Sequence, residues 1–262
     1  MAFRRKSSGK STAATLRPGK SSGRGSRHPR IESAKVIVGT LAIFLLIRTF
    51  LLEAFRIPSG SMIPTLLVGD WLFVNKLAYG PHVPGTRLNL PGYDEPTRGD
   101  VVVFISPPQR DQPADSTPTL VKRCVAVAGD TIHMKNGMLH VNGAEQRQGF
   151  AASQNLATDG SKTHELFLWQ KSFELKTSRF GPPAALPTLD NWGPLIVPAG
   201  TLFMLGDNRY DSKDGRYWGF VPLRNVRGRP LFVYYSYRAD DSDRPVPFLT
   251  DIRWGRIGTR IR

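Results

Sequence analysis

LVKRCVAVA, the stretch Leu120–Ala128, has the pattern of a β-strand, because it is short, rich in aliphatic residues and bounded by turn-forming residues. Three further runs have the same character: Trp71–Lys76 (WLFVNK), Val101–Ile105 (VVVFI) and Leu231–Tyr237 (LFVYYSY). Gly and Pro make up 46 of the 262 residues, which fits many turns and few long helices. These runs predict a mainly β fold.

A hairpin signal in the sequence indicates antiparallel pairing of two strands. Asn136-Gly137 separates the runs TIHMK and MLHV, and this dipeptide is the strongest short hairpin signal. Residues 144–195 are rich in Ala, Ser, Gln and Pro with little periodicity, so we interpret them as an insertion. We therefore expect an antiparallel-sheet core with a smaller inserted β-rich region. The chain length leaves the number of domains open.

The charge is concentrated at the N-terminus. The chain carries 36 Lys and Arg against 21 Asp and Glu, a net charge of +15, and nine of the basic residues lie in residues 1–30 without an acidic residue. Residues 1–32 are also rich in Ser and Gly, so we expect a disordered basic tail. Such a tail could bind nucleic acid or phospholipid, or could flank a membrane segment on its cytoplasmic side.

The segment after the tail favours the interpretation that the basic residues flank a membrane segment. From Ser33 the chain reads SAKVIVGTLAIFLLIRTFLLEAF, and residues 33–54 approach the length that crosses a bilayer. A buried helix and a cleaved signal peptide are the alternatives, but no small-x-small cleavage site follows. We expect one transmembrane anchor with a cytoplasmic N-terminus. Residues 55–262 would then form an extracytoplasmic β domain.

The first candidate for chemistry is the loop after this anchor, which contains Ser59 and Ser61 between two prolines. A serine nucleophile needs a base, usually histidine. None of the five histidines has an obvious acidic partner or a metal-ligand spacing, and no G-x-S-x-G motif is present. The single cysteine excludes an intramolecular disulfide and a multi-cysteine metal site.

Lysine is the alternative base. Lys122 lies among aliphatic residues of a predicted strand, where burial would lower its pKa and leave a neutral amine. A Ser–Lys pair is a known variant of hydroxyl activation. Arg123 would point to the opposite face of the strand. The motif alone also fits a solvated Lys–Arg pair at a strand end.

A dense polar loop, GDNRYDSKDGRYWGFVP, covers residues 206–222. Its Asp and Arg side chains suggest ion pairs that brace a site, and Ser212 could hold a lysine amine. The spacing does not match an EF-hand, and no histidine contributes to a metal site.

The motifs SGSMIPTL, GDWLFVNK, RGDVVVF, KRCVAVAGD and GDNRYDSKDGRYWGFVP, in this order behind one anchor, resemble the bacterial type I signal peptidases. The resemblance covers roughly residues 33–142 and 196–260. It implies a serine endopeptidase that removes signal peptides after Ala-x-Ala sites through an acyl-enzyme, without metal or cofactor. It also implies that the antiparallel core is catalytic.

The resemblance assigns roles to individual residues. Ser61 corresponds to the nucleophile and Lys122 to the general base, while Ser59 corresponds to an oxyanion-hole donor and Ser212 to a residue that orients the lysine. Shallow pockets for small substrate side chains are implied at Ile57, Pro58, Met62, Leu66 and Val121. The bracing loop is implied at Asp207, Arg209, Asp214 and Arg216.

Three positions call for comment. Gly215 stands where the family commonly has serine, and Tyr210 where a small polar residue is more usual, so we expect altered loop rigidity with activity retained. Cys124 is expected to be an inert core residue.

The sequence thus predicts a monomeric membrane-anchored endopeptidase at the outer surface of the bacterial cytoplasmic membrane, acting on secretory preproteins. Phospholipid is an expected partner and nucleic acid is not. The alternatives are a peptidase dedicated to one substrate, such as a pilin or conjugation factor, and a non-catalytic tethered β domain. A DNA-linked Ser–Lys autoprotease would need the basic tail on nucleic acid, which the anchor disfavours.

Overall fold

The computed structural model describes residues 29–86, 88–113, 117–146, 164–176, 179–240 and 242–262. Most of the predicted basic tail lies outside these ranges. Residues 1–42 and 43–262 belong to separate compact units.

The first described element is the apolar helix. Helix α1 (Pro29–Leu46) continues as a π-helical turn, Ile47–Leu51. The 20 residues Glu32–Leu51 are long and apolar enough to cross a membrane. Strand β1 begins at Leu52, so the helix ends three residues before the end of the predicted anchor. These last residues alternate in exposure along the strand instead.

The remaining elements are mainly strands. Their bounds are β1 (Leu52–Arg56), β2 (Asp70–Asn75), β3 (Val101–Ile105), β4 (Thr119–Val127), β5 (Thr131–Lys135), β6 (Met138–Val141), β7 (Ala144–Glu145), β8 (Trp192–Ile196), β9 (Thr201–Leu205), β10 (Val221–Pro222) and β11 (Val226–Ser236). Short helices are α2 (Gly215–Trp218), α3 (Pro247–Thr250) and the 3₁₀ segments Gly60–Met62, Glu165–Ser172, Leu223–Asn225 and Trp254–Arg256. The mainly β prediction is confirmed.

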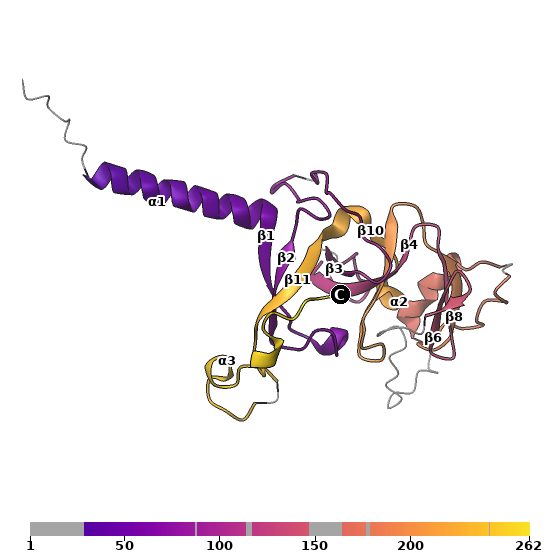
Figure 1. The fold of residues 1–262 in the computed structure, drawn as a ribbon. Helices are drawn as coiled ribbons and strands as arrows, with labels where there is room; N and C mark the ends of the chain where they lie inside the picture. Colours follow the sequence, from indigo (N-terminus) through magenta and orange to yellow (C-terminus); the bar gives the residue numbers. More distant parts are fainter. Residues whose placement is uncertain (1–28, 87, 114–116, 147–163, 177–178, 241) are drawn as a thin grey trace, which may run out of the picture. The chain divides into compact units, whose positions relative to one another are not determined.

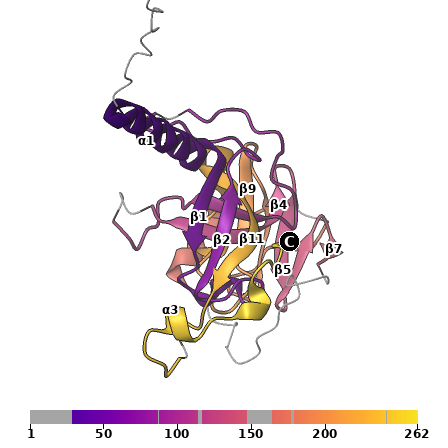
Figure 2. The ribbon, with the colours of Figure 1, turned by 60° about the vertical axis from the view of Figure 1, so that its left-hand side comes forward.

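The larger sheet has the strand order β1-β2-β11-β3-β4-β9-β10, and its neighbouring strands are antiparallel. Figures 1 and 2 show β11 lying beside β2. Strand β11 pairs with both β2 and β3 and carries bulges in each ladder, which bend the strand and curl the sheet. At Gly228 a side-chain Cβ would lie 2.5 Å from the Asn75 carbonyl oxygen, so only glycine fits this crossing.

The smaller sheet has the order β7-β6-β5-β8. The predicted hairpin forms between β5 and β6, with positive φ at both Asn136 and Gly137. Its strands come from residues 131–145 and 192–196, so most of the predicted insertion, 144–195, contributes loops and one 3₁₀ segment where it is described. Residues 147–163 lie outside the described ranges. The β-rich part therefore lies mainly at the two ends of the predicted insertion.

Two hydrophobic cores bear on the site. One lies between the smaller sheet and the ends of β4 and β9, where Trp192 and Phe203 are fully buried. The other packs Ile57, Met62 and Leu66 against residues of β2, β3 and β11. Because three residues of the serine loop are buried in this second core, the loop has little freedom to move.

Candidate active site

The serine loop leaves β1 and forms the 3₁₀ turn Gly60–Met62. Ser61 in this turn is buried, with 9% of its surface exposed. Asn208 fixes the turn from the polar loop: its backbone N–H donates to the Ser61 carbonyl (3.1 Å) and its side-chain amide to that of Gly60 (3.2 Å). Asn208 therefore holds the backbone carbonyls of both Gly60 and Ser61.

Lys122 reaches Ser61 from the middle of β4, opposite Val102 of β3. Its side chain is 4% exposed, and its Nζ donates a hydrogen bond to Ser61 Oγ. No carboxylate within the described residues forms an ion pair with this amine. Burial lowers the pKa of Lys122 to about 8, although the charges of Asp214 and Asp207 act in the opposite direction. A neutral amine is thus accessible near neutral pH.

The polar loop carries a buried ion pair. Arg216 donates to Asp214 through Nε (2.8 Å) and Nη2 (2.9 Å), and the Gly206 N–H also donates to this carboxylate (3.0 Å). Burial alone would raise the pKa of the Asp214 carboxyl, but the charge and hydrogen bonds of Arg216 hold it below its usual value. Arg209 is buried beside them and donates to the Gly206 carbonyl (3.1 Å). These contacts fit the predicted bracing role.

Asp207 accepts hydrogen bonds from residues outside its own loop. It accepts from Arg123 Nε and Nη2, both at 2.7 Å, and from Thr65 Oγ1 (2.5 Å). Arg123 therefore ties the polar loop to the serine loop while its neighbour Lys122 contacts Ser61. These roles of Arg123, Thr65 and Asn208 were not predicted from the sequence. The only signal for Arg123 was its place beside Lys122.

Ser212 lies at the site without the predicted bond to Lys122. Its Oγ is buried and has no hydrogen-bond partner in the described part of the chain. A Cβ at Gly206 would lie 2.2 Å from this oxygen and 2.5 Å from the Ser61 carbonyl oxygen, so Gly206 lets the two loops approach. The orienting role of Ser212 stays a prediction.

A small cavity of about 90 Å³ opens beside Ser61. Its lining includes Lys122, Ser59 and four of the five predicted pocket residues, Ile57, Pro58, Met62 and Val121. Leu66 is not among them, because it is fully buried in the core beneath. The sequence analysis missed Phe55, Arg56, Thr119 and Leu120, which also line the cavity. Its small volume fits the predicted pockets for small side chains.

The two departures from the family pattern have structural explanations. At Gly215 a Cβ would lie 2.8 Å from the Met204 carbonyl oxygen, so this backbone leaves no room for a serine. The Tyr210 hydroxyl donates to Asp190 (2.6 Å), which ties the polar loop to the segment before β8. Burial, followed by this contact, raises the pKa of Tyr210 to about 12.

Other candidate nucleophiles and bases lie apart from this chemistry. Cys124 is fully buried, and burial raises the pKa of its thiol to about 12, as expected for an inert residue. Within the described residues no histidine lines the Ser61 cavity. In the same part of the chain, no three His, Cys, Asp or Glu side chains are grouped so as to hold a metal ion.

An antiparallel β fold with a buried Ser–Lys pair beside a small cavity has the arrangement of a serine hydrolase that uses lysine as its base. Residues 30–235 match the family model described as signal peptidase, peptidase S26. Signal peptidase I of Buchnera aphidicola (from Acyrthosiphon pisum) is 33% identical, with 84% of this chain and 78% of that protein covered. The corresponding proteins of Pseudomonas aeruginosa (36%; 79% and 73%) and Pseudomonas fluorescens (34%; 87% and 78%) are equally similar. The chain belongs to the peptidase S26 family of signal peptidases and is a serine endopeptidase.

Proposed function

We propose that this chain removes signal peptides from exported preproteins, with Ser61 as nucleophile and Lys122 as general base. The observation that carries the proposal is the hydrogen bond from Lys122 Nζ to Ser61 Oγ in a site that lowers the pKa of the lysine to about 8. A lysine with this pKa can accept a proton at physiological pH, which an exposed lysine rarely does.

The reaction starts when the neutral amine of Lys122 takes the Ser61 proton and Ser61 Oγ attacks the carbonyl carbon of the preprotein residue at position −1. The oxyanion of the tetrahedral intermediate accepts hydrogen bonds from the Ser59 hydroxyl and the Ser61 N–H. Removal of one such donor costs about 2.7–4 kcal/mol in other enzymes. As the C–N bond breaks, the Lys122 ammonium returns its proton to the leaving amine of the mature protein.

The acyl-enzyme is then hydrolysed. Lys122, neutral again, takes a proton from water, whose oxygen attacks the ester carbonyl. Collapse of the second tetrahedral intermediate breaks the bond to Ser61 Oγ, and the serine regains its proton from Lys122. The small cavity supports selection of alanine at positions −1 and −3, because larger side chains would overlap its walls.

We also propose that the chain spans the bacterial cytoplasmic membrane once, with residues 1–32 in the cytoplasm and residues 55–262 outside. The basic residues before the apolar helix support this orientation. Anchoring enzyme and preprotein in one phospholipid bilayer raises their effective concentration, so weak pockets suffice. We expect a monomer that does not bind nucleic acid. External protease should digest the β domain in spheroplasts but leave an N-terminal tag intact.

The test of the chemistry uses the purified full chain in detergent and a preprotein with an Ala-x-Ala site. Mass spectrometry should locate a single cut after the second alanine. Ser61→Ala and Lys122→Met should each lose about 10³-fold or more in rate. Lys122→Arg, which keeps a charge but cannot act as a base, should lose as much. A thermal melt of each variant confirms its fold.

Equal cutting by Lys122→Met and the unaltered chain would remove the lysine from the mechanism. Cleavage of only one among many preproteins would favour a peptidase dedicated to a single substrate.

A further inference from the structure

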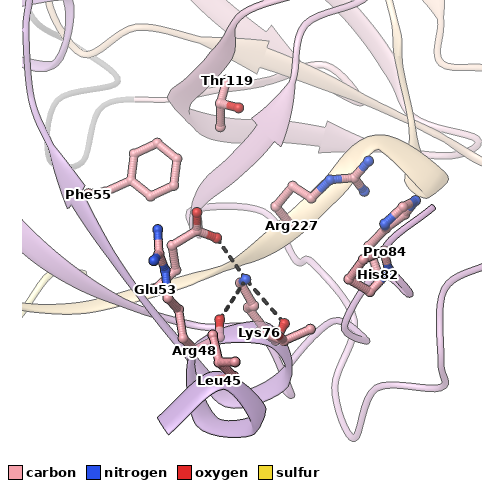
Figure 3. Close-up of a pocket in the computed structure, with 10 residues that line it drawn as sticks. Leu45, Arg48, Glu53, Phe55, Lys76, His82, Pro84, Thr119 and Arg227 are labelled. Carbon is pink, nitrogen blue, oxygen red and sulfur yellow. Dashed lines mark hydrogen bonds and ion pairs between the residues drawn. The ribbon is translucent and has the colours of Figure 1, made fainter. Parts of the chain in front are cut away.

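A second cavity, of about 450 Å³, lies along β1 (Figure 3). Its lining combines charged, polar and apolar residues: Leu45, Arg48, Thr49, Glu53, Phe55, Lys76, His82, Pro84, Thr119 and Arg227. Phe55 and Thr119 also line the small cavity beside Ser61. The two cavities therefore adjoin at these two residues, and together they are called the cleft below. The first is lined partly by apolar side chains and the second is rich in charge.

Glu53 and Lys76 neutralise each other in this second cavity. Lys76 Nζ lies 2.9 Å from Glu53 Oε2 and donates to the carbonyls of Arg48 (3.1 Å) and Thr49 (3.2 Å). The three contacts use the three hydrogens of the ammonium group. The pair thus adds no net charge to the cavity, and Figure 3 shows it at the centre of the lining residues.

Two further charged groups line the cavity, the guanidinium groups of Arg48 and Arg227. Arg227 reaches the cavity from β11, is half-buried, and donates to the carbonyls of Arg224 (2.9 Å) and Val226 (3.1 Å). Within the described part of the chain, neither Arg227 nor Arg48 forms an ion pair with a carboxylate. Burial lowers the pKa of Arg227, and Glu53 offsets this effect only in part. The cavity therefore has a surplus of positive charge that an anion would neutralise.

The geometry of β1 indicates which part of a preprotein would reach this cavity. Glu53, Phe55 and Ile57 alternate with more exposed residues and so point to one face. A preprotein bound as an extended strand in the cleft repeats this two-residue spacing. With its −1 side chain at Ile57, beside Ser61, its −3 side chain lies at Phe55. The −5 side chain, about 13 Å from the first, then lies at Glu53.

We propose that the second cavity is a subsite for an acidic side chain at position −5 of the preprotein, bound by Arg227. The proposal rests on the proposed function, because it takes Ser61 as the site of cleavage. An anionic phospholipid headgroup has related chemistry. The peptide is favoured because the cavity continues the Ser61 cavity through Phe55 and Thr119.

The experiment compares two peptides that differ only in Asp or Asn at position −5, with Ala at −1 and −3. The full chain cleaves them in uncharged detergent, and the full-length Ser61→Ala variant binds them without turnover. We expect the Asp peptide to be favoured about five- to tenfold in both kcat/KM and affinity. Arg227→Gln should bring this ratio near one. Arg224→Gln, a matched loss of charge outside the cavity lining, should leave it unchanged.

The outcomes separate the possible explanations. An Asp/Asn ratio near one in the unaltered chain, or a ratio that Arg227→Gln does not change, would overturn the subsite. If Arg227→Gln instead slows both peptides equally, and only in phosphatidylglycerol vesicles, the cavity binds a lipid headgroup and the proposal is wrong. If no peptide is cleaved, the proposed function fails, while binding to the Ser61→Ala chain still decides the subsite.

Discussion

Lys122 and Lys76 both point into the cleft, but their surroundings differ. Lys122 is 4% exposed, and within the described residues its Nζ has one hydrogen-bond partner, the neutral Ser61 hydroxyl. The Lys76 side chain is 16% exposed, and its Nζ has a carboxylate and two helix-end carbonyls as partners. Burial without a paired carboxylate makes a lysine a base, whereas burial with one makes it a structural tie.

The two carboxylates that most strongly favour the charged form of Lys122 are each paired with an arginine. Asp214 is paired with Arg216, and Asp207 with Arg123. Their charges still act on Lys122 through space, but their oxygens are directed to guanidinium groups. Arg216 of the polar loop and Arg123 of β4 therefore engage the carboxylates that could otherwise pair with Lys122 as Glu53 pairs with Lys76.

The largest expected effect comes from breaking this arrangement at Asp214. Asp214→Asn leaves the buried Arg216 uncompensated, so we expect a loss of about 3–5 kcal/mol in the free energy of unfolding. The loss of a negative charge near Lys122 should also lower the pKa of the lysine below about 8. Thermal melts and the pH dependence of kcat/KM measure the two effects.

Asp111→Asn is the matched control for this prediction. It breaks the ion pair with Lys213, whose side chains are 33% and 43% exposed. Solvent screens such an exposed pair, so its loss should change the free energy of unfolding little. Equal destabilisation by the two variants would show that the Asp214–Arg216 pair is not the brace described here.

The second prediction concerns pH. The pKa of Lys122 is about 8 in the folded chain and 10.5 in a model lysine, so the folded state binds fewer protons between these values. Stability should therefore rise with pH in this window, by up to about 3 kcal/mol from Lys122 alone. Below pH 8 the buried amine is charged and destabilises the folded state. Lys122→Met should therefore melt at a higher temperature than the unaltered chain in this pH range. This difference should disappear above pH 10.

The rate of cleavage should also depend on the protonation state of Lys122. Below about pH 8, kcat/KM should fall tenfold per pH unit, because only the neutral amine accepts the Ser61 proton. A midpoint near pH 6.5 would indicate a histidine base instead.

The outcome at individual residues shows how far a sequence can predict this site. The strands, the Asn136-Gly137 hairpin and the apolar helix follow from local patterns, and the structure confirms them. The pairing of Arg123 with Asp207 joins residues 84 positions apart, and no local pattern encodes it. The second cavity was missed for the same reason, since its residues come from separate segments between Leu45 and Arg227. Leu66 was predicted to line the substrate pocket but is buried in the core. The motif places this residue near the site without giving the direction of its side chain.

The smallest expected effect comes from Lys76. Lys76→Met keeps the aliphatic stem but removes the contacts to Glu53 and to the carbonyls of Arg48 and Thr49. Because the side chain is partly exposed, we expect a loss of about 1–2 kcal/mol in the free energy of unfolding. In contrast to Lys122→Met, the variant should melt at a lower temperature at pH 7, and the midpoint of its rate profile should stay near pH 8. A rise in melting temperature would mean that Lys76, like Lys122, is an uncompensated cation, and the contrast between the two lysines would be lost.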